Sequence, residues 1–239
     1  MTTTLDERLT PPAASTPSDL LTAPAADAGA DEFATRVLAA ALGSLETTAV
    51  HLGERLGWYR ALAEHGPLTS AELARETGTV ERYAREWLEH QAASGYLGIA
   101  ETDPTTGTRR FRLHPGAAEV LTDIDSLSHM APLARLLAGT GRGVDRLLEA
   151  YRGGGGVSWA DLGADAREAQ AAFNRPMFLH QLTQELLPSL PDLHARLEAG
   201  ATVADVGCGE GWSAIGLARG YRSVRVDGFD IDAPSVEAA

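Results

Sequence analysis

The sequence predicts a mainly α-helical chain that ends in a short α/β segment, and three observations lead to this fold class. Apolar side chains recur at three- and four-residue spacing through most of residues 32–199. An alternating segment with turn residues interrupts this pattern between residues 97 and 114. After residue 200, a short apolar run enters a glycine-rich loop, and a second β-rich run covers residues 223–230.

The first 30 residues are rich in Thr, Pro, Ala and Ser. We expect a disordered tail over residues 1–30, because this composition cannot bury enough apolar surface to offset the entropy of ordering. The segment has no basic n-region and no continuous apolar h-region, so it does not resemble a secretory signal. No run is long and apolar enough to predict a membrane span. The single cysteine, Cys208, is typical of a protein in the reducing cytoplasm.

Residues 31–115 have the pattern of three helices followed by a hairpin. Thr69 and Glu72 form a capping-box pattern that predicts a helix over residues 70–77, and Thr79 is the expected cap of the next helix. Residues 97–102 and 108–114 each predict a strand, and residues 103–107 predict the turn between them. This order predicts a winged helix-turn-helix module.

A winged helix raises the question of DNA binding. The chain has a formal net charge of −13, and the helix expected to read DNA carries Glu81, Glu86 and Glu89. Acidic side chains there oppose the phosphate contacts on which DNA affinity depends. The basic cluster of the module is in the wing, at Arg109, Arg110 and Arg112. Nucleic acid is therefore a disfavoured partner, although a winged-helix transcriptional regulator with a vestigial cofactor unit remains the alternative function.

Residues 116–199 predict a helical linker region. Four glycines, Gly153 to Gly156, interrupt the helical pattern. A longer helical stretch follows over residues 165–187, and we expect a kink at Pro176 because proline removes a backbone donor. A short helix is predicted over residues 191–198.

The residues that predict ligand binding lie in the last 40 positions of the sequence. Residues 202–206 predict a strand, residues 207–211 (GCGEG) a loop, residues 212–219 a helix and residues 223–230 a second strand. This order is the first β-α-β unit of an open parallel sheet, in which the glycines let a ligand approach the helix N-terminus. Asp230 follows Gly211 by 19 positions and ends the second strand. A carboxylate there can accept hydrogen bonds from both hydroxyls of an adenosine ribose.

The loop departs from the dinucleotide-binding pattern. That pattern, G-x-G-x-x-G/A, requires a small residue at position 212, where this sequence has Trp212. An NAD-linked oxidoreductase is therefore a less favoured alternative.

Two segments, VADVGCGEG and GFDID, resemble motif I and the strand-two acidic motif of class I S-adenosylmethionine-dependent methyltransferases. The resemblance implies S-adenosylmethionine as cofactor and Asp230 as the group that holds its ribose. It further implies that Asp205 lies beneath the loop and that Ile231 lies beside the adenine. The loop around the methionine part of the cofactor would be formed by Gly207, Cys208, Gly209 and Gly211.

The order of the predicted domains extends the resemblance upstream. A winged-helix domain (31–115), a helical linker (116–199) and the start of a Rossmann-like domain (200–239) resemble the layout of bacterial small-molecule methyltransferases. That family implies a small-molecule methyl acceptor and a homodimer formed through the N-terminal domain. In the segment AAFNRPMF it further implies that Phe173 and Met177 pack on the cofactor, although their spacing of four residues on one helix face is explained equally well by core packing. The histidines show no metal-ligand spacing, and no residue is assigned as a catalytic base.

Two predicted parallel strands are few for a doubly wound domain, which needs about five to bury both faces of its sheet. We therefore expect an incomplete Rossmann-like unit and an incomplete methyltransferase, either a fragment or a prematurely ended reading frame. The corresponding functional expectation is weak or no cofactor binding and no turnover by residues 1–239.

Overall fold

A computed structural model describes residues 29–239 of the chain. The predicted disordered tail covers residues 1–30, of which 1–28 lie outside the described residues. Contacts divide the chain into two compact units, which meet after Thr47. The first described helix, α2 (Ala30–Arg55), crosses this boundary, and the first unit contains its N-terminal part.

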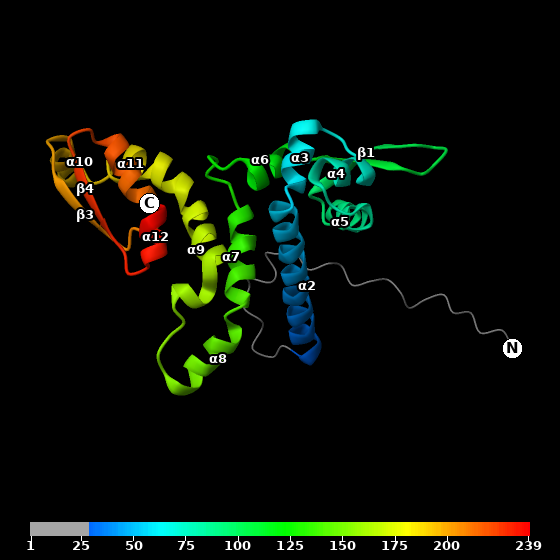
Figure 1. Ribbon diagram of the computed structural model, residues 1–239, viewed down its shortest axis with the longest axis horizontal. Helices are drawn as coiled ribbons and strands as arrows, with labels where there is room; N and C mark the ends of the chain where they lie inside the picture. The colour runs from blue at the N-terminus through cyan, green and yellow to red at the C-terminus, as the bar shows by residue number, and fades with distance from the viewer. Residues whose placement is uncertain (1–28) are drawn as a thin grey trace. The chain divides into compact units, whose positions relative to one another are not determined.

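The second unit begins with the winged helix-turn-helix elements that the sequence predicts (Figure 1). They are α3 (Trp58–His65), α4 (Ser70–Thr77), α5 (Glu81–Ala93), β1 (Leu97–Thr102) and β2 (Arg109–Leu113). The two strands pair antiparallel, and Leu68, ahead of α4, forms an isolated bridge with Phe111. This bridge connects the segment before α4 to β2, one of the two strands that form the wing of the module.

An aromatic cluster forms the core of this domain. Trp87 lies with its ring 4.8 Å from that of Trp58 and 5.0 Å from that of Tyr59. The Tyr59 hydroxyl donates to the side chain of Gln91, which is fully buried. The buried amide thus has a hydrogen-bond partner, which offsets the cost of removing it from water.

The capping box at the start of α4 is confirmed, whereas the prediction that Thr79 caps α5 is wrong. Glu72 N donates to Thr69 Oγ1 at 3.2 Å, and Thr69 N donates to Glu72 Oε2 at 2.9 Å. Helix α5 begins after Val80, which makes no side-chain cap. Thr79 instead accepts a hydrogen bond from Trp58 Nε1 at 3.2 Å. Its hydroxyl therefore makes a tertiary hydrogen bond instead of capping α5.

Replacement of Glu72 by Ala is expected to lower the free energy of unfolding by about 1 kcal/mol at pH 7, the usual cost of losing a cap. The amide of Thr69 and the guanidinium of Arg110 lower the pKa of Glu72 below 4.5. Because this pKa is lowered on folding, the stabilisation is present above pH 4.5 and is lost as the pH falls through the folded-state pKa. Urea unfolding of wild type, Glu72→Ala and the control Glu76→Ala at pH 7 and pH 3 measures the effect. Equal losses from the two variants at pH 7 would contradict it.

The predicted linker is a series of helices. They are α6 (Pro115–Thr122), α7 (Ala131–Gly141), α8 (Val144–Gly153), α9 (Trp159–Pro176) and α10 (Pro191–Glu198), with a π-helical segment, η1 (Met177–Leu186), between the last two. Helices α7 and α9 run side by side (Figure 1), because Gly139 lets the backbone at Ala166 approach closely. The expected interruption at Pro176 is a change from α- to π-helical winding.

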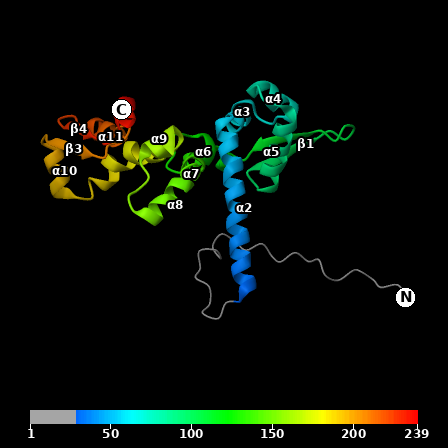
Figure 2. The same cartoon turned by 60° about the horizontal axis from the view of Figure 1, so that its bottom comes forward.

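The C-terminal elements form the predicted β-α-β unit (Figure 2). They are β3 (Thr202–Val206), α11 (Trp212–Gly220), β4 (Arg225–Phe229) and a short helix, α12 (Ala233–Ala238). The strands β3 and β4 are parallel, with Thr202 opposite Arg225 and Val206 opposite Phe229. Leu197, Leu217 and Tyr221 form the buried cluster beneath them. Parallel register brings the carboxyl ends of both strands to one edge, where ligands bind in sheets of this kind.

Within residues 29–239, no helix is long and apolar enough to cross a membrane. The same residues contain no group of three or more His, Cys, Asp or Glu side chains that could hold a metal ion.

Candidate functional site

The glycine loop has a backbone that only glycine adopts without strain. Gly207, Gly209 and Gly211 have φ angles of +80°, +54° and +77°. The amides of Gly207 and Cys208 both donate to the carbonyl of Phe229, at 2.7 and 3.1 Å. The end of β4 therefore holds the start of the loop in place, and side chains at the three glycine positions would strain it.

Asp230 holds the centre of the same loop. Its carboxylate accepts from Gly209 N at 2.8 Å and from Asp232 N at 2.9 Å. The amides of Asp232 and Gly209 lower the pKa of Asp230, because they stabilise the charged carboxylate. Each carboxylate oxygen can accept more than one hydrogen bond, so Asp230 retains capacity for hydroxyl donors of a ligand.

Asp205 and Cys208 flank the loop at the end of β3. The Asp205 carboxylate accepts from the hydroxyl of Ser213 in the first turn of α11. Burial, together with the charges of Asp205 and Asp230, raises the pKa of the Cys208 thiol. The thiol is therefore protonated at neutral pH, which is unsuitable for a nucleophile.

These residues border a cavity of about 530 Å³ at the carboxyl ends of the two strands. The structure brings together six of the seven residues that the sequence assigned to the cofactor, namely Asp205, Gly207, Cys208, Gly209, Asp230 and Ile231. Gly211 does not line the cavity. It is the N-cap of α11, and its left-handed backbone directs that helix toward the loop.

The other wall of the cavity, which α9 and η1 supply, was not predicted from the sequence. The lining side chains there are Trp159, Arg167, Gln170, Ala171, Asn174 and Phe178. Phe173 and Met177, the residues indicated by the family resemblance, are not among the lining residues. The lining residues of these helices recur at three- and four-residue spacing and share one face, and Phe173 and Met177 lie outside that set.

Arg167 is the single basic side chain among the residues that line this cavity. Its guanidinium lies 3.5 Å from Asp232, and its side chain is 18% exposed. The other charged lining groups are carboxylates, and burial together with Glu168 raises the pKa of one of them, Glu210. The cavity therefore combines a largely anionic wall with one positive group.

Trp212, which excluded the dinucleotide pattern, has a structural role at the start of α11. The Arg175 guanidinium lies 4.9 Å from the centre of its ring, within range of a cation–π interaction. Arg175 also donates to the Ile124 carbonyl at 2.8 Å and to Asp125 at 2.6 Å. One arginine thus connects the glycine-loop helix to the segment after α6.

Two of the three arginines of the wing, Arg109 and Arg110, bind carboxylates of their own domain. Arg109 lies 3.0 Å from Glu89, and Arg110 lies 2.6 Å from Glu72. Arg110 also donates to the carbonyl of Pro67 at 2.9 Å. These contacts reduce the positive charge that the wing presents to phosphate groups.

Comparison with family models matches residues 44–123 to the Rv2258c-like winged HTH domain. A sequence comparison with curated proteins finds no match. The matched range begins in α2 and ends after α6, so it is shifted toward the C-terminus relative to the predicted winged-helix domain over residues 31–115.

Among solved structures, the mitomycin 7-O-methyltransferase MmcR is 24% identical, with a TM-score of 0.57 over 88% of this chain and 60% of that one. Human N-acetylserotonin methyltransferase in complex with SAM is 21% identical, with a TM-score of 0.56 over 89% and 62%. The SAH-bound calicheamicin-biosynthesis methyltransferase CalO1 is 22% identical, with a TM-score of 0.52 over 89% and 62%. The chain thus spans about three fifths of the length of these structures. Residues 44–123 are a winged helix-turn-helix domain, and the chain shares the fold of S-adenosylmethionine-dependent methyltransferases, with a Rossmann-like β-α-β unit over β3, α11 and β4.

Proposed function

We propose that the cavity at the carboxyl ends of β3 and β4 is a site for S-adenosylmethionine and that the function to which it belongs is methyl transfer to a small molecule, with no turnover expected of residues 1–239. The observation that carries this proposal is the contact between Asp230 and the amide of Gly209, inside the glycine loop. It fixes a carboxylate beside a helix N-terminus in a cavity of about 530 Å³. The solved methyltransferases that share the fold, two of them with SAM or SAH bound, support the same ligand.

The lining residues fit the chemical groups of this cofactor. Asp230 has acceptor capacity for the ribose hydroxyls, and Ile231, which is 98% exposed, offers an apolar surface for the adenine. Arg167 is placed to bind the carboxylate of the methionine part, and the carboxylates of Asp205 and Glu210 suit its positive groups. Because the adenine side is so exposed, we expect binding by residues 1–239 to be saturable but weak.

Methyl transfer depends more on the positioning of the acceptor than on acid–base groups. When bound, the cofactor supplies a methyl group already activated by its sulfonium. The protein's task is to align an acceptor with that methyl and to exclude water, and a base is needed only where the acceptor must lose a proton. Trp159 and Phe178 supply apolar surface in the same cavity, which suits a small organic acceptor.

Replacement of Arg167 by Gln is expected to weaken binding of S-adenosylhomocysteine by about tenfold, the effect of losing one charge-assisted hydrogen bond. Binding of 5′-methylthioadenosine should be unchanged, because this ligand lacks the amino-acid carboxylate. Isothermal titration of both ligands measures the difference. Arg146→Gln is the matched control, since Arg146 pairs with Asp161 at 3.1 Å and does not line the cavity. Equal weakening of both ligands would contradict this role of Arg167.

We also propose that the protein forms a homodimer through its N-terminal domain. In the first unit, α2 exposes five large apolar side chains at helical spacing, between 51 and 71% exposed. They are Phe33, Val37, Leu38, Leu42 and Leu45. An apolar stripe of this kind is typical of a surface that binds a protein partner.

A charge in this stripe is expected to dissociate the dimer. Leu38→Glu should give the monomer mass by size-exclusion chromatography with light scattering, at concentrations where wild type is dimeric. Thr35→Glu, at a position whose hydroxyl already bonds within the helix to Asp31, is the control. A wild-type monomer, or a dimer that persists in Leu38→Glu, would contradict the proposal.

A further inference from the structure

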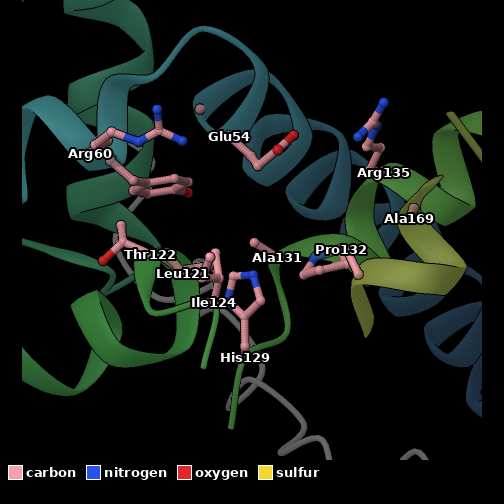
Figure 3. Close-up of a pocket in the computed structure, with 13 residues that line it drawn as sticks. Glu54, Arg60, Leu121, Thr122, Ile124, His129, Ala131, Pro132, Arg135 and Ala169 are labelled. Carbon is pink, nitrogen blue, oxygen red and sulfur yellow. The ribbon is translucent and has the colours of Figure 1, made fainter. Parts of the chain in front are cut away.

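A second cavity, of about 130 Å³, lies on the other side of α9. It is bordered by the end of α2, by α3 and by the segments around α6 and α7, and Figure 3 shows Glu54 and His129 extending into it from different elements. Ala169 and Ala172 face this cavity, whereas Gln170, Ala171 and Asn174 face the cavity of the glycine loop. The two cavities therefore lie on different faces of one helix, and a ligand in the second is separated from the proposed methyl-transfer site.

Glu54 presents an unsatisfied acceptor to this cavity. Its Oε2 atom is buried and has no hydrogen-bond partner among the described residues. Leaving a buried charged acceptor unpaired is costly, and native structures rarely do so without a reason. A bound donor is one such reason.

His129 presents a second acceptor. Its Nδ1 lies 3.2 Å from the Val120 carbonyl. A carbonyl oxygen only accepts, so Nδ1 carries the proton in this contact. Burial lowers the pKa of His129, so the ring is neutral at neutral pH and Nε2 is left as a lone-pair acceptor.

The two arginines that line the cavity differ in their pairing. Arg135 contacts Asp165, at 3.1 Å, and Glu168, so its charge is matched. Arg60 is exposed and makes no ion pair within the described part of the chain, although it lines the same cavity as Glu54. The cavity therefore contains one guanidinium and one carboxylate oxygen that do not pair with each other.

We propose that this cavity binds a small zwitterion, a free amino acid with a short side chain. Its ammonium donates to Glu54 Oε2 and to His129 Nε2, and its carboxylate accepts from Arg60. At about 130 Å³ the cavity is small, which favours a ligand of a few non-hydrogen atoms. Leu121, Ile124 and Pro132 supply apolar wall for a short side chain.

Calorimetric titration with glycine and alanine tests this assignment, with methylamine and acetate as ligands that carry one charge each. Wild type is expected to bind a zwitterion at least about tenfold more tightly than either single-charge ligand, since each charged contact adds to the affinity. Glu54→Gln and Arg60→Gln should each weaken zwitterion binding by about tenfold or more. Glu64→Gln, at an exposed position of α3, should leave it unchanged.

Three results would overturn the proposal: no saturable binding of a zwitterion to wild type, methylamine binding as tightly as alanine, or equal alanine affinity in wild type and both variants. Glu54→Gln is expected to fold, because Oε2 has no partner to lose. If circular dichroism shows that it does not fold, Arg60→Gln alone decides the question. Glu54 and Arg60 do not line the glycine-loop cavity, so failure here leaves the proposed methyl transfer untouched, and the reverse also holds.

Discussion

Replacement of Asp230 by Ala is expected to weaken binding of S-adenosylhomocysteine by about ten- to a hundredfold. The substitution removes two backbone contacts at once, the hydrogen bonds from Gly209 N and Asp232 N. The ribose loses one hydrogen bond to a charged group, which contributes about 1.5–3 kcal/mol and accounts for the expected loss of affinity. Titration calorimetry measures the affinity.

Two variants make this result specific. Asp227→Ala removes a carboxylate from the same strand, β4, where Asp227 pairs with Arg225 and does not line the cavity. It should bind as wild type does. Asp230→Asn keeps an acceptor for one amide and should give an intermediate affinity. Full affinity in Asp230→Ala would show that the loop does not depend on this carboxylate.

Replacement of Gly216 by Ala is expected to lower the free energy of unfolding by about 2 kcal/mol. Helix α11 packs on η1 at backbone distance here, and a Cβ at Gly216 would lie 2.3 Å from the Phe178 carbonyl oxygen. Relief of such a contact requires the helices to separate, and overpacking of this kind costs about 1–3 kcal/mol. Because Phe178 lines the glycine-loop cavity, the affinity for S-adenosylhomocysteine should fall as well. Chemical denaturation followed by circular dichroism measures the stability.

A glycine-to-alanine substitution where the added methyl group meets no other atom is expected to stabilise the protein instead. Gly43 lies in α2, and a Cβ there meets nothing within 4 Å. Gly43→Ala should therefore raise helix stability by up to about 1 kcal/mol, the difference in helix propensity. Similar effects at the two positions would show that the contact with Phe178 is not limiting.

Several elements were predictable because local signals specify them. The capping box at Thr69 and Glu72 predicted α4 to the residue, and proline at the first helical position predicted α10. The apolar run before Gly207 predicted β3. Parallel pairing of β3 with β4 follows from one intervening helix, because that connection returns the chain in the same direction.

Other features depend on contacts between distant residues. Thr79 has the chemistry of a helix cap, but the indole of Trp58 uses its hydroxyl. Phe178, instead of Phe173 or Met177, lines the cavity, because it follows Asn174 by four residues on the helix face that packs toward α11, and the sequence does not show which face that is. Arg167 has an ordinary helical sequence context, and its place in the site is set by the packing of α9 against α11.

The second cavity could not be predicted from the sequence either. Glu54 and His129 are 75 positions apart and belong to segments that showed only helical spacing or no regular pattern. An unsatisfied carboxylate oxygen is a property of the packed structure, since any exposed glutamate would be hydrated.

Titration of residues 1–239 with S-adenosylhomocysteine, with NAD as competitor, tests the proposed cofactor site most directly. Trp159 and Trp212 line the cavity, so binding should change tryptophan fluorescence in step with the calorimetric signal. The proposed function predicts weak, saturable binding at one site per chain that Asp230→Ala reduces and NAD does not displace. Absence of saturable binding, or displacement by NAD, would contradict the assignment of this cavity to S-adenosylmethionine.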